Sequence, residues 1–402
     1  MTGIGLEKCH LERERGAGCD IIGLAKHESV MNMKTLAVII ASLVCLATMP
    51  ALSAPRPNDE PGAEARGKRD IVILPIVFYT PETKFAGGVG GLLTFRPRGA
   101  KPSDRPSSIY FYGIFTQLKQ FSMSWEPEFY FGKAAYLLKG RLLVERYPDK
   151  FWGLGPETPD AAEEDYTPRS VQIEASFLKK VLPRAHIYAG LQLRYEDFRI
   201  LKAGPPGGLL GRGAVAGSAG GSVVGLGFIL NRDSRDDIFF PRRGDYWQLS
   251  ALFNSRAFGG DFAYTAVKLE ARKYVPVFAS HVLAFQAQLQ SVSGTPPFHS
   301  YAKLGSDLMM RGYYAGRFRD RVMAGVQAEY RMPLFWRFGV VGFAGLGNVG
   351  PKIGTLDLAR LKHSIGAGLR FRVSSRETTN LRVDVAFGKN TSGVYFTARE
   401  AF

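Results

Sequence analysis

The stretch from Phe285 to Ser291 reads Phe-Gln-Ala-Gln-Leu-Gln-Ser and alternates apolar and polar residues. In a β-strand successive side chains point to opposite faces, so Phe285, Ala287 and Leu289 would share an apolar face opposite the three glutamines. A helix would scatter the same residues around its circumference. The stretch therefore predicts a strand with one apolar face and one face in water.

The same alternation recurs along most of the chain. Many of the segments reach the roughly 9 to 11 residues that cross a bilayer at a tilt, whereas strands of soluble proteins usually have about five or six. The pattern predicts an all-β fold, a transmembrane antiparallel β-barrel of about 16 strands over residues 71–402. The approximate strands are 71–79, 85–96, 108–117, 121–132, 135–146, 168–180, 184–200, 222–232, 244–256, 260–275, 279–293, 320–334, 337–348, 362–374, 379–389 and 392–402.

The lengths of the connections alternate as well. Most even-numbered strands end in tight turns such as 132–135, while odd-numbered strands are followed by long insertions such as 292–320. Membrane barrels have short periplasmic turns and longer extracellular loops. The alternation predicts that both termini are periplasmic, and the long connections 95–108 and 231–244 are exceptions to it.

The N-terminal residues read as a leader. Residues 31–53 combine a basic start at Lys34, an apolar core and the small-x-small sequence Ala51-Leu52-Ser53, the three regions of a secretory signal peptide. A hydrophobic strand at a domain start is the alternative. Residues 1–30 are then a non-native upstream extension and 54–70 a periplasmic linker. The predicted location is the outer membrane of a Gram-negative cell.

Composition excludes several classes of protein. With 402 residues, 46% hydrophobic and 12% aromatic, the chain is too apolar to be disordered. The longest apolar run, 36–46, is too short for a membrane-spanning helix. All three cysteines lie within the first 45 residues, so the predicted mature chain has no disulfide, cysteine zinc site or cysteine nucleophile. Its net charge of +16 implies an acidic partner or an anionic surface.

Signatures of enzymes are missing. The sequence has no G-x-S-x-G, H-E-x-x-H or P-loop motif. Residues 345–350 formally spell G-x-G-x-x-G, but they end a predicted strand and no helix pattern follows. The six histidines are scattered. We expect no catalytic residue, no metal site, no cofactor and no nucleic-acid partner.

One segment is more specific. Between the eleventh and twelfth strands the chain reads Leu304-Gly-Ser-Asp-Leu-Met-Met-Arg-Gly-Tyr313. This resembles a loop motif of the BamA/TamA family, the bacterial surface antigen barrels that insert or transport proteins at the outer membrane. The resemblance implies that the loop folds back into the lumen and that Arg311, Gly312 and Tyr313 form its interior motif. It also implies that Arg311 meets acidic residues on the barrel wall.

Further matches surround the loop. Residues 328–333, 366–370 and 382–388 resemble the family's later strands, and 231–244 resembles its Asp-x-Arg-Asp...Pro-x-x-Gly turn. From its residues alone, this turn is most simply one whose side chains satisfy its own backbone, and a docking site for a periplasmic partner is the alternative. Phe402 matches the aromatic end of many outer-membrane barrels and is the expected C-terminal assembly signal. The turn residues singled out are Asp233, Arg235, Asp236, Pro241 and Gly244.

The sequence also departs from the family. The soluble POTRA repeats of the full-length assembly proteins are not recognised, and Gly345 stands where the family usually has an aspartate. We therefore predict Glu329 as the partner that pins Arg311, because alternation places Glu329 on the polar face of the twelfth strand. Asp384 is either a second acid for Arg311 or part of an ordinary charge network in the lumen. The alternative is that Arg311 is a solvated extracellular charge without a fixed partner.

The resemblance implies a function in inserting or transporting proteins at the outer membrane. A separate periplasmic or lipoprotein partner would replace the POTRA repeats, and a weak seam between the first and last strands would template a client strand. Other expected contacts are outer-membrane lipid, lipopolysaccharide and, during biogenesis, the outer-membrane assembly machinery. A passive, anion-favouring pore or a structural surface antigen without clients is the alternative. A secreted soluble all-β binding protein is a third reading.

Overall fold

The computed structural model describes residues 69–80, 84–96, 105–278, 280–373, 380–397 and 400–402. The predicted upstream extension and signal peptide lie outside the described residues, as does the linker up to residue 68. Arg69 and Asp70, assigned to the linker by sequence, belong to the first strand.

The described chain is one antiparallel sheet of 17 strands, of which β6 (Asp149–Phe151) is a short one that pairs with β7. The other sixteen follow the predicted series and pair in chain order, which confirms the strand count. They are β1 (Arg69–Thr80), β2 (Lys84–Phe95), β3 (Ser107–Thr116), β4 (Phe121–Phe131), β5 (Tyr136–Arg146), β7 (Glu164–Leu182), β8 (Ile187–Lys202), β9 (Gly220–Asp233), β10 (Gly244–Asn254), β11 (Tyr264–Val277), β12 (His281–Gly294), β15 (Val322–Pro333), β16 (Phe338–Gly350), β17 (Lys362–Arg372), β18 (Asn380–Gly388) and β19 (Thr391–Thr397).

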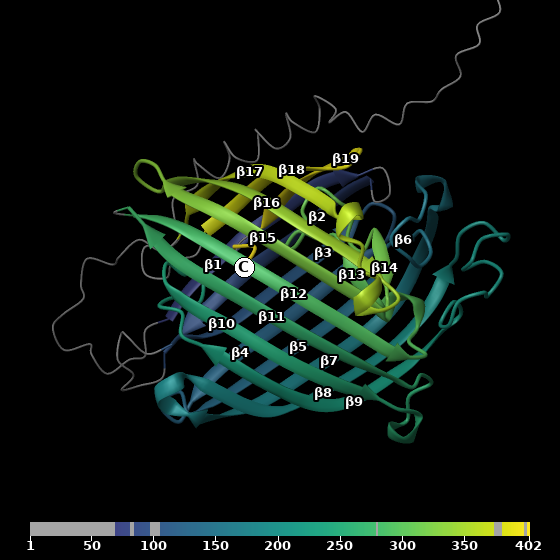
Figure 1. The fold of residues 1–402 in the computed structure, drawn as a ribbon, viewed down its shortest axis with the longest axis horizontal. Helices are drawn as coiled ribbons and strands as arrows, with labels where there is room; N and C mark the ends of the chain where they lie inside the picture. Colours follow the sequence, from purple (N-terminus) through teal and green to yellow (C-terminus); the bar gives the residue numbers. More distant parts are fainter. Residues whose placement is uncertain (1–68, 81–83, 97–104, 279, 374–379, 398–399) are drawn as a thin grey trace, which may run out of the picture.

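The sheet curls round on itself, so that the blue and teal strands lie behind the green ones in Figure 1. A separate pair, β13 (Ala302–Leu304) and β14 (Phe318–Asp320), lies within the connection between β12 and β15. The helices of the described residues are short 3-10 turns, and none is long and apolar enough to cross a membrane. They are η1 (Asp160–Ala162), η2 (Pro183–Ala185), η3 (Arg256–Phe258), η4 (Phe298–Ser300), η5 (Ile353–Thr355) and η6 (Leu358–Arg360).

The two faces of the sheet are inverted relative to a soluble protein. On β12 the side chain of Phe285 is 43% exposed on the outer face, whereas Gln286 is 4% exposed and points inward. On β15 Val326 lies outside, and Gln327 and Glu329 are buried inside. An apolar outer face around a polar interior is the arrangement of a membrane β-barrel. The alternation in the sequence predicted both faces correctly.

Most of the connections follow the predicted alternation, although 117–120 and 389–390 are short where long insertions were expected. One end of the sheet, here called the short-turn end, has tight turns such as 132–135 and 334–337. The opposite, long-loop end carries the connections 147–163, 203–219 and 295–321. The last of these is the longest connection among the described residues, and it carries the Arg-Gly-Tyr motif.

The last strand corrects one prediction. It was expected to cover 392–402, but β19 ends at Thr397. Val394 and Phe396 face outward on β19, so a longer strand would place Glu400 on the apolar outer face. Burying an unpaired carboxylate in such a medium is costly. Glu400 instead lies inside, where Arg370 Nε donates a 2.7 Å hydrogen bond to its Oε2.

Candidate functional site

The loop 295–321, called here the lumenal loop, folds into the interior of the sheet. Leu304, Met310 and Tyr313 are buried in a cluster with residues from the surrounding strands. That cluster draws on β8, β9, β11, β12, β15 and β16, so the loop touches several sides of the interior. Its further members are Phe198, Val223, Tyr264, Val292, Ala302, Met309, Phe318, Met323 and Val349.

Arg311 forms the most enclosed contact of this loop. Its side chain is 0% exposed. Nη1 donates to Asp384 Oδ2 and Nη2 to Glu329 Oε1, both at 2.6 Å, and the guanidinium lies 3.4 Å from the ring centroid of Phe343. Charge-assisted hydrogen bonds and a cation–π contact act together here. The structure thus brings Arg311 to both acids named from the sequence, and Arg311 is not a solvated charge.

Gly312 occupies a position that other residues do not fit. Its φ is +101°, and a Cβ added there would lie 2.8 Å from the backbone carbon of Phe387 and 2.9 Å from the nitrogen of Gly388. Its own N–H donates to the Tyr395 hydroxyl at 2.8 Å, and its carbonyl accepts from Thr391 Oγ1 at 2.9 Å. The backbone of the motif is therefore held by β19, the last strand.

Tyr313 extends the contact to β17 and to the turn after β18. Its hydroxyl donates to the backbone oxygen of His363 at 3.0 Å and accepts from the N–H of Lys389 at 2.9 Å. Gly388 leaves the space for its ring, since a Cβ there would lie 2.6 Å from ring atoms. Three consecutive residues thus contact all of the last five strands, β15 to β19.

The acids that hold Arg311 are shared with other arginines. Glu329 Oε2 pairs with Arg331 at 2.9 Å, and Asp384 Oδ1 pairs with Arg370 at 2.6 Å. Arg382 Nε lies 3.5 Å from Asp384 Oδ2. All of these side chains are buried. Asp384 is therefore both a partner of Arg311 and a member of a wider charge network in the interior.

The residue that departs from the family pattern has a structural counterpart. A Cβ at Gly345 would lie 3.2 Å from Met310 Sδ and 3.2 Å from Gln327 Cβ. The thioether of Met310, from the lumenal loop, therefore fills the space beside Gly345. Any larger residue at 345 would have to displace Met310, the neighbour of Arg311.

The base of the lumenal loop is tied to the connection 147–163. Arg317 Nη2 donates to Asp160 Oδ1 at 2.6 Å and to the backbone oxygen of Thr158 at 2.7 Å. The N–H of Gly155 donates to the oxygen of Arg319 at 2.8 Å. The loop is thus held at two places. Strands β15 to β19 hold its tip, residues 311–313. The connection 147–163 holds its base, residues 299–303 and 317–319, through Arg317 and Arg319.

Two basic side chains at the base sit among charges. His299 Nε2 lies 2.9 Å from Glu196 Oε1 on β8. Burial, followed by the nearby charge of Arg319, lowers the pKa of Lys303 to about 8, and the carboxylate of Asp149 opposes this shift. Lys303 therefore loses its positive charge at a lower pH than an ordinary lysine does.

The turn motif 231–244 lies at the short-turn end. Asp233 is buried and is held by Arg235, whose Nη2 donates to it at 2.8 Å, and also by Arg105. Asp236 Oδ1 accepts the N–H groups of Arg242 and Arg243. Asp236 therefore satisfies backbone groups of its own turn. The pairing with Arg105, 128 residues away, was not predicted.

The other turn residues shape the backbone. Gly244 has a φ of +99°, and a Cβ there would lie 2.4 Å from the oxygen of Ser234. Pro241 is buried. Arg105 lies in the long connection between β2 and β3, and Asp233 is the last residue of β9, directly before the long connection to β10. These connections are the two exceptions noted in the sequence. Both exceptional connections therefore meet through one partly buried ion pair.

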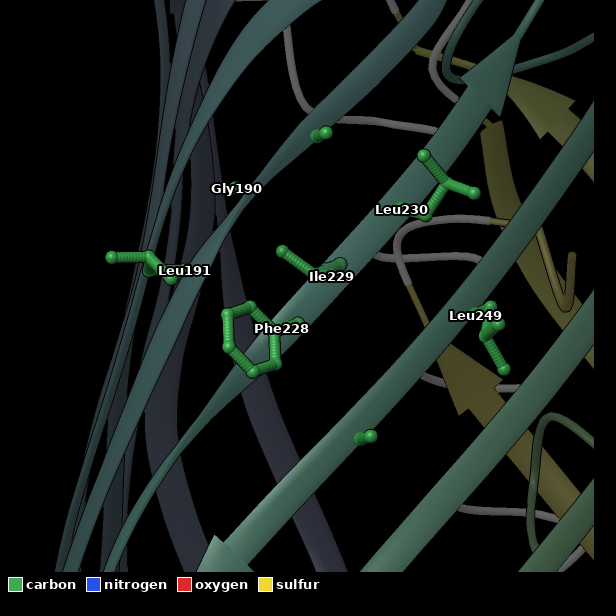
Figure 2. A pocket seen from close by; sticks show the side chains of 8 residues that line it. Gly190, Leu191, Phe228, Ile229, Leu230 and Leu249 are labelled. Carbon is green, nitrogen blue, oxygen red and sulfur yellow. The ribbon is translucent and has the colours of Figure 1, made fainter.

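A shallow apolar hollow lies on the outer face of β8, β9 and β10 (Figure 2). Leu191, Phe228, Leu230 and Leu249 line it and are exposed. No charged side chain lines it. This hollow belongs to the apolar outer face rather than to the charged interior. Within the described residues, no group of three or more His, Cys, Asp or Glu side chains could hold a metal ion.

A solved structure of a barrel protein supports the fold. Among solved structures, the chain is similar to BamA from Haemophilus ducreyi lacking POTRA domains 1–3, with 14% identity and a TM-score of 0.50 over 83% of this chain and 69% of that one. It is also similar to CdiB from Acinetobacter baumannii, with 10% identity and a TM-score of 0.49 over 83% of this chain and 65% of that one. No curated protein matches the sequence.

A family model described as the Omp85 superfamily domain matches residues 115–402. The match includes the lumenal loop, both acids that hold Arg311 and the turn motif 231–244. Since it covers well over half of the sequence, the chain belongs to the Omp85 superfamily.

Proposed function

We propose that this protein is an outer-membrane barrel that assists the insertion or translocation of other proteins at the outer membrane of a Gram-negative cell. The observation that carries the proposal is the pair of buried contacts from Arg311 to Glu329 and Asp384, called here the Arg311 pin. Gly312, the next residue, hydrogen bonds to Tyr395 on the last strand, so the same motif also contacts that strand. Membership of the Omp85 superfamily supports it. The protein would have periplasmic termini and would act with a separate periplasmic or lipoprotein partner.

The proposed site of action is the seam between the first strand, β1, and the last strand, β19. β1 has 12 residues and β19 has seven, so a seam between them could form at most the hydrogen-bonded pairs that the shorter strand allows. A strand edge with unused N–H and C=O groups can pair with another chain. A client strand would add to this edge and then leave sideways into the membrane.

The lumenal loop would hold β19 ready for this role. Tyr395 and Thr391 lie on the inner side of β19 and both hydrogen bond to Gly312. Because Gly312 follows Arg311, the buried ion pairs fix the position of the last strand from inside. Loss of the pin would let the seam edge shift, and pairing with a client strand would become less specific.

A passive anion-favouring pore is supported less well. The lumenal loop is tied to the wall at its tip and to the connection 147–163 at its base. A loop held at both ends across the interior narrows any path for solutes. The basic charge of the chain is equally suited to contact with lipid phosphates or lipopolysaccharide.

Cysteine locking of the seam tests the proposal. The native cysteines all lie in the first 45 residues, so the barrel itself is a clean background. Ile73 on β1 would be paired in turn with Val394 and Phe396 on β19, each as cysteine. Val385→Cys with Val394→Cys is the matched control, because these residues already face each other on β18 and β19.

The readouts are conductance in a planar bilayer and rescue of a depletion phenotype in cells. We expect the β1–β19 lock to abolish rescue while conductance stays intact, and the control lock to leave both unchanged. Full rescue with the seam locked would overturn the proposal and favour a closed structural barrel or pore.

A further inference from the structure

The apolar hollow on β8, β9 and β10 is formed by small residues among large ones. Ala189 on β8 lies opposite Leu230 of β9, and Ala251 on β10 lies opposite Phe228. Each alanine leaves a gap between leucine and phenylalanine side chains that are exposed on the outer face. The resulting hollow has a volume of about 460 Å³ and is open on its outer side (Figure 2).

The hollow lies near the short-turn end of these strands. Ala189 is the third residue of β8, and Leu230 lies three residues before the end of β9. Closer to that end, Trp247 precedes Leu249 by two residues on the same face of β10 and is 49% exposed. Exposed tryptophans mark the level at which a membrane meets water. The hollow therefore lies just inside the hydrocarbon, next to one headgroup layer.

Three basic side chains and one acidic side chain lie on the outer face beside the hollow. Arg232 of β9 lies opposite Trp247, and its Nε is 3.2 Å from Asp245 Oδ1. Asp245 Oδ2 is also 3.8 Å from Lys273 Nζ. One carboxylate thus serves two cations, whose side chains are 46% and 58% exposed. The group keeps a net positive charge at the headgroup level.

Lys179 of β7 is the third of these cations. It lies opposite Ala189, which lines the hollow, and is exposed between Phe177 and Val181, which are exposed on the same face of its strand. Its ammonium has no ion pair or hydrogen bond with any residue that the structure describes. An unpaired ammonium on a membrane-facing apolar surface is costly unless it reaches an anion or water. The flexible lysine side chain can extend along such a surface to the headgroup layer.

We infer that this face of β7 to β10 binds one anionic glycerophospholipid of the leaflet at the short-turn end. One acyl chain would occupy the hollow, and the phosphate would lie over the start of β8, between Lys179 and Arg232. β7 and β9 are about 10 Å apart, a gap that two long side chains leaning over β8 can close onto one phosphate. Basic residues near a membrane surface favour anionic over zwitterionic headgroups.

The inference rests on the proposed function only in that the sheet lies in a membrane. It adds a lipid ligand on the outer face, remote from the lumenal loop and from the seam between β1 and β19. The lipid would fix the depth of this wall of the sheet in the membrane.

Quenching of Trp247 fluorescence by a brominated lipid chain tests the inference. The full-length chain would keep Trp247 as its only tryptophan, with Trp125, Trp152 and Trp336 replaced by phenylalanine. It would be reconstituted into phosphatidylcholine vesicles that contain a small share of brominated phosphatidylglycerol or, separately, of brominated phosphatidylcholine. Folding of each form is checked by its gel shift on heating.

A second single-tryptophan chain serves as the reference. It keeps Trp125, which is 46% exposed on the outer face of β4, away from the hollow. We expect phosphatidylglycerol to reach half-maximal quenching of Trp247 at an about fivefold lower share of the lipid than phosphatidylcholine does. Trp125 should respond equally to the two lipids.

Two variants of the Trp247 chain separate the headgroup contact from the hollow. Lys179→Gln should reduce the preference for phosphatidylglycerol, whereas Lys202→Gln, the same change at the other end of β8, should leave it unchanged. Ala251→Leu fills the hollow and should weaken quenching of Trp247 by phosphatidylglycerol. Ala344→Leu, an exposed position on β16, is its control and should have no effect.

Equal quenching of Trp247 by the two lipids would overturn the inference, and so would a preference that survives both Lys179→Gln and Ala251→Leu. Either result leaves the seam-locking test of the proposed function untouched. Absence of quenching of both tryptophans by both lipids would show that the sheet does not lie in the membrane, and would overturn the inference and the proposed function together.

Discussion

The tip and the base of the lumenal loop use ion pairs of the same length in opposite surroundings. At the tip, Arg311 Nη1 lies 2.6 Å from Asp384 Oδ2, and both side chains are 0% exposed. At the base, Arg317 Nη2 also lies 2.6 Å from its partner, Asp160 Oδ1, but the side chain of Asp160 is 85% exposed. Distance alone would rank the two contacts as equal.

The difference in burial decides what each contact does. An exposed pair is screened by water and salt and contributes little. A buried pair brings little net stability compared with apolar packing, but removal of one partner leaves an uncompensated charge in the interior. The tip is therefore fixed in one position, whereas the base can adjust its contacts.

Loss of Arg311 should have the largest effect. Arg311→Ala leaves Glu329 and Asp384 without one of their partners, and we expect it to lower the free energy of unfolding by about 3–5 kcal/mol. Protease cleavage within the loop should also increase. Denaturant unfolding in detergent and limited proteolysis measure both effects. Arg141→Ala, which removes a half-exposed pair with Glu126, is the control, and an equal loss in both variants would contradict the special role of the tip.

Gly312→Ala should have the next largest effect. The positive φ and the close approach of Phe387 and Gly388 force either strain or displacement of the loop. We expect a loss of about 1–3 kcal/mol in the same unfolding assay. Gly354→Ala is the matched control, because an added Cβ there would meet no atom within 4 Å. A Gly312 variant as stable as this control would show that the tip tolerates rearrangement.

Alkaline pH should act on the base and not on the tip. The pKa of Lys303 is lowered to about 8 from its usual 10.5, so between these values the unfolded chain binds more protons than the folded one. Stability conferred by this group therefore rises as pH increases from about 8 to 10. Proteolysis of the loop across this range measures it. Lys303→Met should flatten the profile, and an unchanged slope would assign the effect to other groups.

Removal of the exposed partner at the base should have the smallest effect. Asp160→Asn keeps the shape of the side chain, and Arg317 retains its hydrogen bonds to Thr158. We expect a change below about 1 kcal/mol, further reduced at high salt. A loss as large as that of Arg311→Ala would show that exposure does not distinguish the two ends.

Much of this architecture is readable from the sequence. Alternation predicted the sixteen long strands, because each face of a membrane barrel strand meets a uniform medium over its whole length. The same alternation placed Glu329 and Asp384 on the inner face, where both contact Arg311. The family resemblance supplied the motif around Arg311, which periodicity alone does not single out.

Other features depend on contacts between distant parts of the chain. The predicted last strand ran through 392–402, yet Phe402 lies in a pocket of Tyr274 and Arg331, because Glu400 pairs better with Arg370 than with the outer medium. Tyr395 could have been suspected, since it is a polar aromatic residue on the inner face of the last strand. The pairing of Arg105 with Asp233 joins two turns 128 residues apart, and no local pattern indicates it.

A pair of double-mutant cycles tests the central claim most directly. Arg311→Ala and Asp384→Asn would be combined in one cycle and Arg317→Ala and Asp160→Asn in the other, with unfolding free energy as the readout. We expect a coupling energy of about 2 kcal/mol or more at the tip and below about 0.5 kcal/mol at the base. Equal coupling in the two cycles would contradict it, because burial would then not be what pins the lumenal loop.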